Sequence, residues 1–141
     1  MAAEQERLPV FVYGTLRPGQ ANHGRYLRGR TVAEEPARLR GAVLYEGPGY
    51  PYAVADPGGE VRGELIVVSP GEYAAVLASL DELEGCGPDG AGEMYVRAVR
   101  PVLPGSSGGE VRAWVYLAAE RTARRLRAVG TRVAGGSWPQ P

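Results

Sequence analysis

Two short stretches of the sequence carry residues whose types and spacing could do chemistry. In the first, the apolar run 8–13 has strand character and stops abruptly at the turn 14–16, Gly-Thr-Leu. A turn that only reversed the chain would need no more than Pro-Gly or Asn-Gly. We therefore expect this turn to present main-chain N–H groups to a ligand, where they would hold a carboxylate or steady an oxyanion.

The second stretch is the acidic end of a predicted helix, and Glu84 is its distinctive member. It lies four residues after Leu80 and seven after Leu77, so it continues the apolar face of the helix. A carboxylate directed inward without a cation has a raised pKa, which suits general acid–base catalysis near neutral pH. A salt-bridged structural glutamate would fit the same position, and the neighbouring Glu82 fits a solvated face.

Two other patterns match well-known signatures but lack the structural context that those signatures need. The segment 85–90 spells GxGxxG, yet it follows a helix rather than a strand, which predicts a loop instead of a dinucleotide site. The segment 105–109 spells GxSxG, yet it joins two predicted strands, whereas a nucleophile elbow needs a strand-to-helix turn.

His23 and Cys86 are the only histidine and the only cysteine of the chain. A lone histidine has no partners at metal-ligand spacing, so we expect no metal site. Cys86 lies just beyond the predicted helix, where the helix dipole raises the pKa of a thiol rather than lowering it. A Cys86–His23 catalytic dyad is therefore disfavoured.

The composition limits the class of protein. The chain has 141 residues, and its 16 basic residues, all arginine, balance 16 acidic ones. Zero net charge argues against a nucleic-acid partner, and the lack of lysine excludes a Schiff base or a Ser-Lys pair. A single cysteine allows no internal disulfide. The first residues lack a signal-peptide pattern and no apolar run is long enough to cross a bilayer, which predicts a cytoplasmic protein with no membrane partner.

Helices are expected at three places. The main helix is predicted to begin at a capping box, with Ser69 as the N-cap and Glu72 at N3, and to stop at Gly85. Shorter helices are expected over 20–28 and over the basic segment 120–129.

Glycine and proline divide the remaining apolar residues into short strands. These are expected at 8–13, 32–39, 42–45, 53–55, 61–68, 94–103 and 111–118, with a hairpin-like turn at 57–59. The predicted fold class is α+β, with a mostly antiparallel sheet or small barrel of six or seven strands and one main helix. We expect a single domain over 1–141, with its core at about 8–138.

The order of two motifs resembles the γ-glutamylcyclotransferase-like family, which has a Tyr-Gly-Ser/Thr-Leu turn followed later by Leu-Asp-x-x-Glu-Gly. Here they stand as Tyr13-Gly14-Thr15-Leu16 and Leu80-Asp81-Glu82-Leu83-Glu84-Gly85. The stretch 13–27 is similar to the γ-glutamylamine cyclotransferase branch. Further agreement comes from three later stretches: Tyr95-x-Arg97, Trp114-Val115-Tyr116 and Gly136-Ser137-Trp138.

This resemblance implies a small mixed barrel with a central cavity and short flanking helices. Five residues would bind the γ-glutamyl group, four of them through the backbone amides of one wall, namely Tyr13, Gly14, Thr15 and Leu16, together with Tyr95. Glu84 would be the catalytic acid–base residue. In the family's reaction the α-amine of a γ-glutamyl amide attacks its own γ-carbonyl, which releases 5-oxoproline and a free amine. The implied partner is this small molecule, with no cofactor.

Two alternatives stay open at this point. One is a non-catalytic module that keeps the fold and the cavity for another small ligand. The other is an enzyme that removes a γ-glutamyl protecting group from a biosynthetic intermediate. If the loop 86–94 borders the site, it would either shift the substrate scope or act as a mobile lid. The arginines of 121–127 are expected on a solvated helix face.

Overall fold

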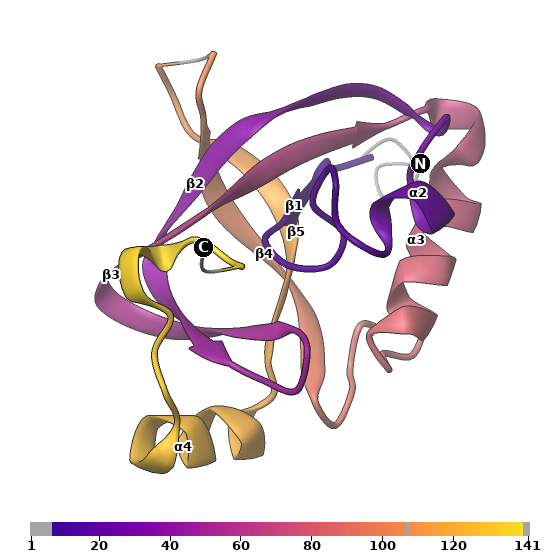
Figure 1. Cartoon of the computed structure of the whole chain (residues 1–141). Coiled ribbons are helices and arrows are strands. Elements are labelled where there is room, and N and C mark those ends of the chain that lie inside the picture. The colour runs from indigo at the N-terminus through magenta and orange to yellow at the C-terminus, as the bar shows by residue number, and fades with distance from the viewer. Residues whose placement is uncertain (1–6, 107, 140–141) are drawn as a thin grey trace.

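A small closed barrel lies at the centre of the fold. The computed structural model of the chain describes residues 7–106 and 108–139. In these ranges five strands close in the order β1-β3-β2-β4-β5 (Figure 1). They are β1 (Val10–Val12), β2 (Thr31–Glu46), β3 (Pro51–Val68), β4 (Tyr95–Pro104) and β5 (Val111–Ala118). Strands β1 and β5 pair in parallel and the other neighbours pair antiparallel, so the predicted α+β class and mixed, mostly antiparallel barrel are confirmed.

The predicted number of strands, six or seven, is too high because β2 and β3 each join two expected strands. The hairpin-like turn expected at 57–59 lies inside β3. Arg40 pairs with Glu60, but the next pair is Ala42 with Ala55, so residues 56–59 of β3 lie opposite one residue of β2. The Pro-Gly-Gly sequence therefore forms an irregularity where the two long strands bend together, and pairing resumes beyond it.

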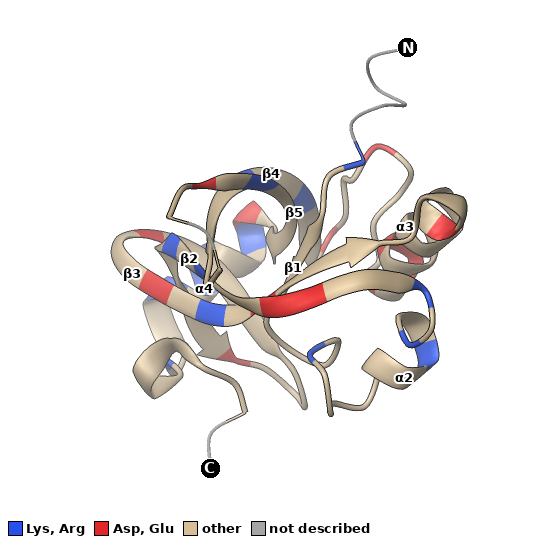
Figure 2. Cartoon of the chain, turned by 90° about the horizontal axis from the view of Figure 1, so that it is seen from above, with Lys and Arg blue, Asp and Glu red and all other residues tan. Residues whose placement is uncertain are grey.

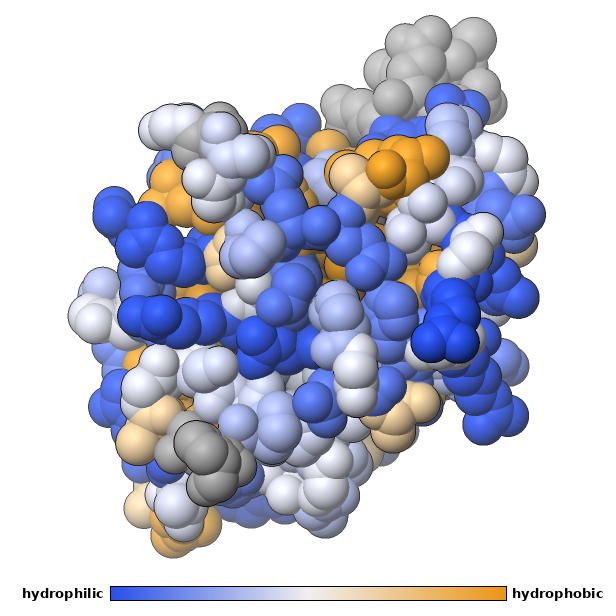
Figure 3. Space-filling model, turned by 45° about the horizontal axis from the view of Figure 1, so that its top comes forward, coloured by the Kyte–Doolittle hydropathy of each residue, from blue (hydrophilic) through white to orange (hydrophobic). Residues whose placement is uncertain are grey.

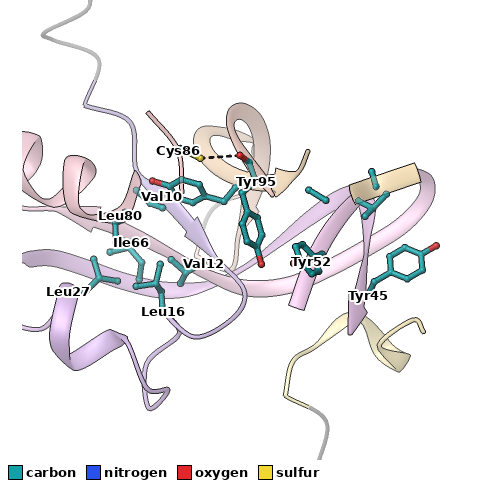
Figure 4. Packing of buried hydrophobic residues seen from close by; sticks show 14 of the residues in the cluster. Val10, Val12, Leu16, Leu27, Tyr45, Tyr52, Ile66, Leu80, Cys86 and Tyr95 are labelled. Atoms are coloured by element: carbon teal, nitrogen blue, oxygen red, sulfur yellow. Dashed lines mark hydrogen bonds between the residues drawn. The ribbon is translucent and has the colours of Figure 1, made fainter. Parts of the chain in front are cut away.

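Strand β1 is short, but it is buried on both of its faces. Its alternate residues enter different apolar clusters, because successive side chains of a strand point to opposite sides. Val10 and Val12 join the cluster that contains Leu80 of the main helix (Figure 4), whereas Phe11 joins the cluster with Val115. Complete burial of a side chain such as Leu80 contributes about 2 kcal/mol to folding. This packing fixes the point from which the chain enters the turn 13–16.

The helices of the described ranges surround the barrel: α2 (His23–Tyr26), α3 (Tyr73–Leu83) and α4 (Glu120–Val129), with short 3₁₀ turns at Pro70–Glu72 and Ala134–Gly136. In Figure 1, α3 stands along one side of the barrel and α4 lies below it. The predicted bounds of α4 are confirmed. Its four arginines, Arg121, Arg124, Arg125 and Arg127, are exposed, as expected for a solvated face.

The start of the main helix differs from the prediction, whereas its end agrees. The Ser69 side chain makes no capping hydrogen bond, and a 3₁₀ turn precedes the α-helix. The prediction of a capping box is therefore wrong. At the other end Gly85 adopts a φ of 76°. Its N–H donates to the Glu82 carbonyl at 3.1 Å, and the Cys86 N–H donates to the Asp81 carbonyl at 2.7 Å. This is a Schellman motif, and it places Glu84 at the C-cap.

Acidic and basic residues are both spread over the surface of the barrel. Figure 2 shows both signs of charge along β2 and β3, whereas the charged residues of β4 are two arginines, Arg97 and Arg100. The face in Figure 3 is mostly hydrophilic, with only small hydrophobic patches between the polar side chains. None of the helices in the described ranges is both long and apolar enough to cross a bilayer.

Candidate active site

A cavity of about 300 Å³ opens where the turn after β1, the end of α3, the start of β4 and the loop before β3 meet. The structure brings all six sequence-predicted site residues to its wall: Tyr13, Gly14, Thr15, Leu16, Glu84 and Tyr95. The turn and the glutamate are about seventy positions apart in the sequence, and only the closed barrel makes them neighbours.

Hydrogen bonds accepted by its carbonyl groups fix the turn 13–16 in place. The Arg17 N–H donates to the Gly14 carbonyl at 3.0 Å, and the Asn22 N–H donates to the Thr15 carbonyl at 2.8 Å. The Asn22 side-chain amide also donates to the Thr15 hydroxyl at 2.9 Å. Within residues 7–106 and 108–139, nothing accepts a hydrogen bond from the N–H groups of Gly14, Thr15 or Leu16. The residues that carry these donors line the cavity.

Arg17 anchors the turn to two distant parts of the chain. Its guanidinium forms a two-pronged ion pair with Glu64 of β3, with N–O distances of 2.8 and 3.0 Å. The same group donates to the Ser137 hydroxyl at 3.2 Å and to the Trp138 carbonyl. Paired hydrogen bonds of this kind fix geometry as well as add energy, so Arg17 holds the turn in register with the barrel.

Gly14 is required by its contact with Pro51, the first residue of β3. A Cβ atom at this position would lie 2.9 Å from the Cδ atom of Pro51, closer than side chains normally approach. The glycine thus lets the turn pack directly against Pro51, which also lines the cavity. The need for glycine here comes from packing within the protein.

Glu84 is half-buried, and its carboxylate has no protein partner among the residues that the structure describes. No ion pair reaches it, which removes the salt-bridged alternative within those residues. Burial raises the pKa of Glu84 from 4.5 to about 7. A carboxyl group with this pKa is about half ionised at neutral pH, so it can both take up and release a proton.

Three tyrosine hydroxyls lie around Glu84, and each donates elsewhere. The Tyr13 hydroxyl donates to the Tyr116 carbonyl, and the Tyr95 hydroxyl donates to the Pro51 carbonyl at 2.8 Å. The Tyr116 hydroxyl donates to Asp81 at 2.7 Å. Burial raises the pKa of all three hydroxyls well above the usual range, and for Tyr116 the hydrogen bond to Asp81 adds to the rise. They are therefore neutral groups that shape the cavity.

Asp81 is a residue of the site region to which the sequence assigned no role. It is buried and forms a two-pronged ion pair with Arg97, with N–O distances of 2.7 and 3.1 Å. The guanidinium of Arg97 lies 4.2 Å from the ring centre of Trp114. One feature of the sequence indicates that Arg97 lies near the site. Arg97 follows Tyr95 by two positions, so both side chains leave β4 on the same face.

The rejected Cys86–His23 dyad has no counterpart in the structure. His23 pairs with Glu34 at 3.0 Å, and the Cys86 thiol donates to the Tyr95 carbonyl at 3.2 Å. Burial raises the pKa of Cys86 to about 11, which keeps the thiol protonated at neutral pH. No three His, Cys, Asp or Glu side chains gather to form a metal site in the described ranges.

The two rejected signatures fall in loops. The segment 85–90 forms turns, and Cys86 pairs with Gly92 in an isolated bridge. The Arg97 N–H donates to the Gly90 carbonyl at 2.8 Å, which joins this loop to β4, and Met94 at the end of the loop lines the cavity. In the other signature, Ser107 lies outside the described residues.

Comparison with known proteins identifies the class to which this barrel and cavity belong. The family described as gamma-glutamyl cyclotransferase, AIG2-like, matches residues 10–140, and the chain belongs to this family. The resemblance seen in the sequence motifs is thereby confirmed.

Individual relatives agree with this assignment. The chain is 34% identical over 109 residues to a gamma-L-glutamyl-butirosin B gamma-glutamyl cyclotransferase of Niallia circulans, a match that spans 77% of this chain and 65% of that protein. The crystal structure of an AIG2-like protein from Mus musculus aligns with a TM-score of 0.68 at 25% identity, over 94% of this chain and 88% of the mouse protein. An uncharacterised protein from Pyrococcus horikoshii shares the fold, with a TM-score of 0.60 at 23% identity, over 93% of this chain and 89% of its own.

Proposed function

We propose that the protein is a γ-glutamyl cyclotransferase that converts a γ-glutamyl amide into 5-oxoproline and a free amine. The observation that carries the proposal is that one cavity is lined both by the Glu84 carboxylate and by the N–H groups of the turn, none of which has a hydrogen-bond partner among the described residues. Membership of the cyclotransferase family supports the same reaction. The partner is a small molecule, no cofactor is required, and the expected location is the cytoplasm.

Proton transfer through Glu84 completes the proposed reaction. The ionised carboxylate takes a proton from the substrate's α-ammonium group, and the amine then attacks the γ-carbonyl carbon. A new C–N bond closes the five-membered ring, and the original amide C–N bond breaks. The protonated Glu84 returns its proton to the leaving nitrogen. The ring nitrogen then gives up its second proton through the same carboxylate, so the lactam keeps one N–H and the amine is released as its ammonium form. A pKa of about 7 suits both halves of this cycle, because efficient acid–base catalysts titrate near the working pH.

The turn supplies binding and charge stabilisation. The N–H groups of Gly14, Thr15 and Leu16 would hold the substrate carboxylate or the oxyanion that develops on the γ-carbonyl oxygen. Because nucleophile and electrophile belong to one molecule, folding that molecule into a reactive pose replaces a protein nucleophile. This agrees with the buried, protonated thiol of Cys86, which is unsuited to attack.

The identity of the leaving amine is guided by the relative from Niallia circulans. Its name describes a cyclotransferase acting on γ-L-glutamyl-butirosin B. This favours the version of the proposal in which the present enzyme removes a γ-glutamyl group from a biosynthetic intermediate. Such conjugates therefore belong in the substrate panel beside γ-glutamyl dipeptides and γ-glutamyl amides of diamines.

A mass-spectrometric assay for 5-oxoproline tests the proposal. Wild type, Glu84→Gln and the control Glu72→Gln are incubated with that panel; Glu72 is an exposed carboxylate at the other end of the main helix. We expect product from wild type and Glu72→Gln, and a loss of about 10²–10⁴ in rate for Glu84→Gln. Equal rates for all three proteins would contradict the role of Glu84. Tight ligand binding without any product would favour the non-catalytic module.

A further inference from the structure

No group in the described part of the chain donates a hydrogen bond to the Glu84 carboxylate, although hydroxyls line the same cavity. Two of these hydroxyls donate to main-chain carbonyls: Tyr13 donates to Tyr116, and Tyr95 donates to Pro51. These acceptors are part of the barrel backbone and cannot move away. The Tyr116 hydroxyl is different because its acceptor is a side chain, Asp81. Whether this hydroxyl stays away from Glu84 therefore depends on Asp81.

Asp81 is held in place from the opposite side. The Nε and Nη2 atoms of Arg97 lie 2.7 and 3.1 Å from its two carboxylate oxygens, and both side chains are only 7% exposed. Burial alone would lower the pKa of Arg97, but Asp81 raises it above the ordinary value. Arg97 in turn packs on Trp114, whose ring N–H donates to the Tyr73 hydroxyl at 2.9 Å. The acceptor for Tyr116 is thus fixed by a chain of contacts running across β4 and β5 to the start of α3.

We propose that Asp81 is a positioning residue for Glu84: held by Arg97, it captures the Tyr116 hydroxyl and so keeps the Glu84 carboxylate free of a donor. The catalytic consequence rests on the proposed function, whereas the arrangement of hydrogen bonds does not. A donor to the ionised form of a carboxylate stabilises that form and lowers its pKa by about one unit per bond. Redirecting Tyr116 would therefore make Glu84 a weaker base.

The other titratable or charged groups on the elements around Glu84 leave this reasoning intact. They come from the loop before β3, from β3 itself, from the end of α3 and the loop after it, and from α4: Tyr50, Tyr52, Glu82, Cys86 and Arg125. In the described part of the chain none of them donates a hydrogen bond to Glu84. The hydroxyls of Tyr50 and Tyr52 interact with each other. Among the described residues, Tyr116 is the cavity tyrosine whose hydroxyl donates to a charged side chain, Asp81.

The test is a ¹³C NMR titration of the Glu84 side-chain carboxyl, assigned by its loss in Glu84→Gln. The first variant is Tyr116→Phe, which removes the hydroxyl and nothing else. We expect the pKa of Glu84 to stay at the wild-type value, because the hydroxyl was not bound to it. A rise would mean that Tyr116 donates to Glu84 in the native protein, and it would overturn the proposal.

The second variant, Asp81→Leu with Arg97→Met, replaces the buried ion pair by apolar side chains and leaves no unpaired charge, an exchange that folded proteins often tolerate. With its acceptor gone, Tyr116 is expected to turn to Glu84 and lower its pKa by about one unit. Adding Tyr116→Phe to this double variant should restore the wild-type value. The proposal would be contradicted if the double variant showed no fall in the pKa of Glu84. It would also be contradicted if the pKa fell equally in the double variant and in the same variant with Tyr116→Phe.

These titrations need no substrate, so they separate the two proposals. If wild type makes no 5-oxoproline, the proposed function fails while the positioning role is still decided by NMR. If wild type is active, the acid limb of kcat/KM should move by the same amount as the pKa of Glu84, and only when the Tyr116 hydroxyl is present. A purely structural role of Asp81 would lower activity without moving that limb.

Discussion

Glu84→Gln should stabilise the folded protein at alkaline pH while abolishing turnover. Burial raises the pKa of Glu84 from 4.5 to about 7, so between these pH values the folded protein holds a proton that the unfolded chain has released. Folding stability must then fall as pH rises through this window. The 2.5-unit difference corresponds to a cost of about 3 kcal/mol, absent below pH 4.5 and complete above pH 7. Glutamine has similar volume and carries no such cost.

Thermal and urea unfolding of wild type and Glu84→Gln at pH 4 and pH 8 would measure this effect. The difference in unfolding free energy between the two proteins should shift toward the variant by about 3 kcal/mol from pH 4 to pH 8, or roughly 10 °C in Tm. Glu72→Gln, an exposed change, should show no such shift. A Glu84→Gln variant whose stability relative to wild type does not change with pH would refute the argument that Glu84 is buried without a partner.

Three further predictions concern the neighbours of the cavity. Gly14→Val should weaken binding of 5-oxoproline at least tenfold, because the new side chain collides with the proline packed 2.9 Å from its Cβ; calorimetric binding checks this, and unchanged affinity would contradict it. Arg17→Met removes the ion pair to Glu64 and should raise KM more than it lowers kcat, since the turn loses its anchor; steady-state kinetics would show the opposite split if Arg17 acted on the chemical step. His23→Ala and Cys86→Ser should keep the single-turnover rate within about threefold of wild type; a large loss in either would revive the dyad.

The sequence predicts the elements best where one local signal decides them. The basic segment 120–129 becomes α4 with the expected bounds, and Gly85 ends α3, because a left-handed residue at C′ is a local requirement. The prediction of a hairpin-like turn at 57–59 is wrong because a Pro-Gly-Gly sequence is compatible both with a turn and with a bend inside a long strand. In the structure β2 and β3 pair on both sides of this segment, so it forms a bend within β3. That pairing depends on residues far away in the sequence.

The candidate site likewise has residues whose placement the sequence predicts and residues whose placement it does not predict. The inward position of Glu84 follows from helix periodicity, and its raised pKa follows from burial. The role of Asp81 could not be read in this way, because a carboxylate beside Leu80 has the same local pattern whether it is solvated or buried. Its partners, Arg97 and Tyr116, lie opposite each other on the paired strands β4 and β5, far from Asp81 in the sequence. Only the packing of α3 against these two strands brings the three groups together.

The dependence of kcat/KM on pH, measured as 5-oxoproline release from a γ-glutamyl amide, tests the central claim most directly. Because the ionised form of Glu84 is the proposed base, the wild-type rate should fall about tenfold per pH unit below pH 7. In Glu84→Gln the residual rate should lie lower by about 10²–10⁴ and lack this limb, which separates it from titration of the substrate amine. An acid limb near pH 7 that persists in Glu84→Gln at an undiminished rate would contradict the account.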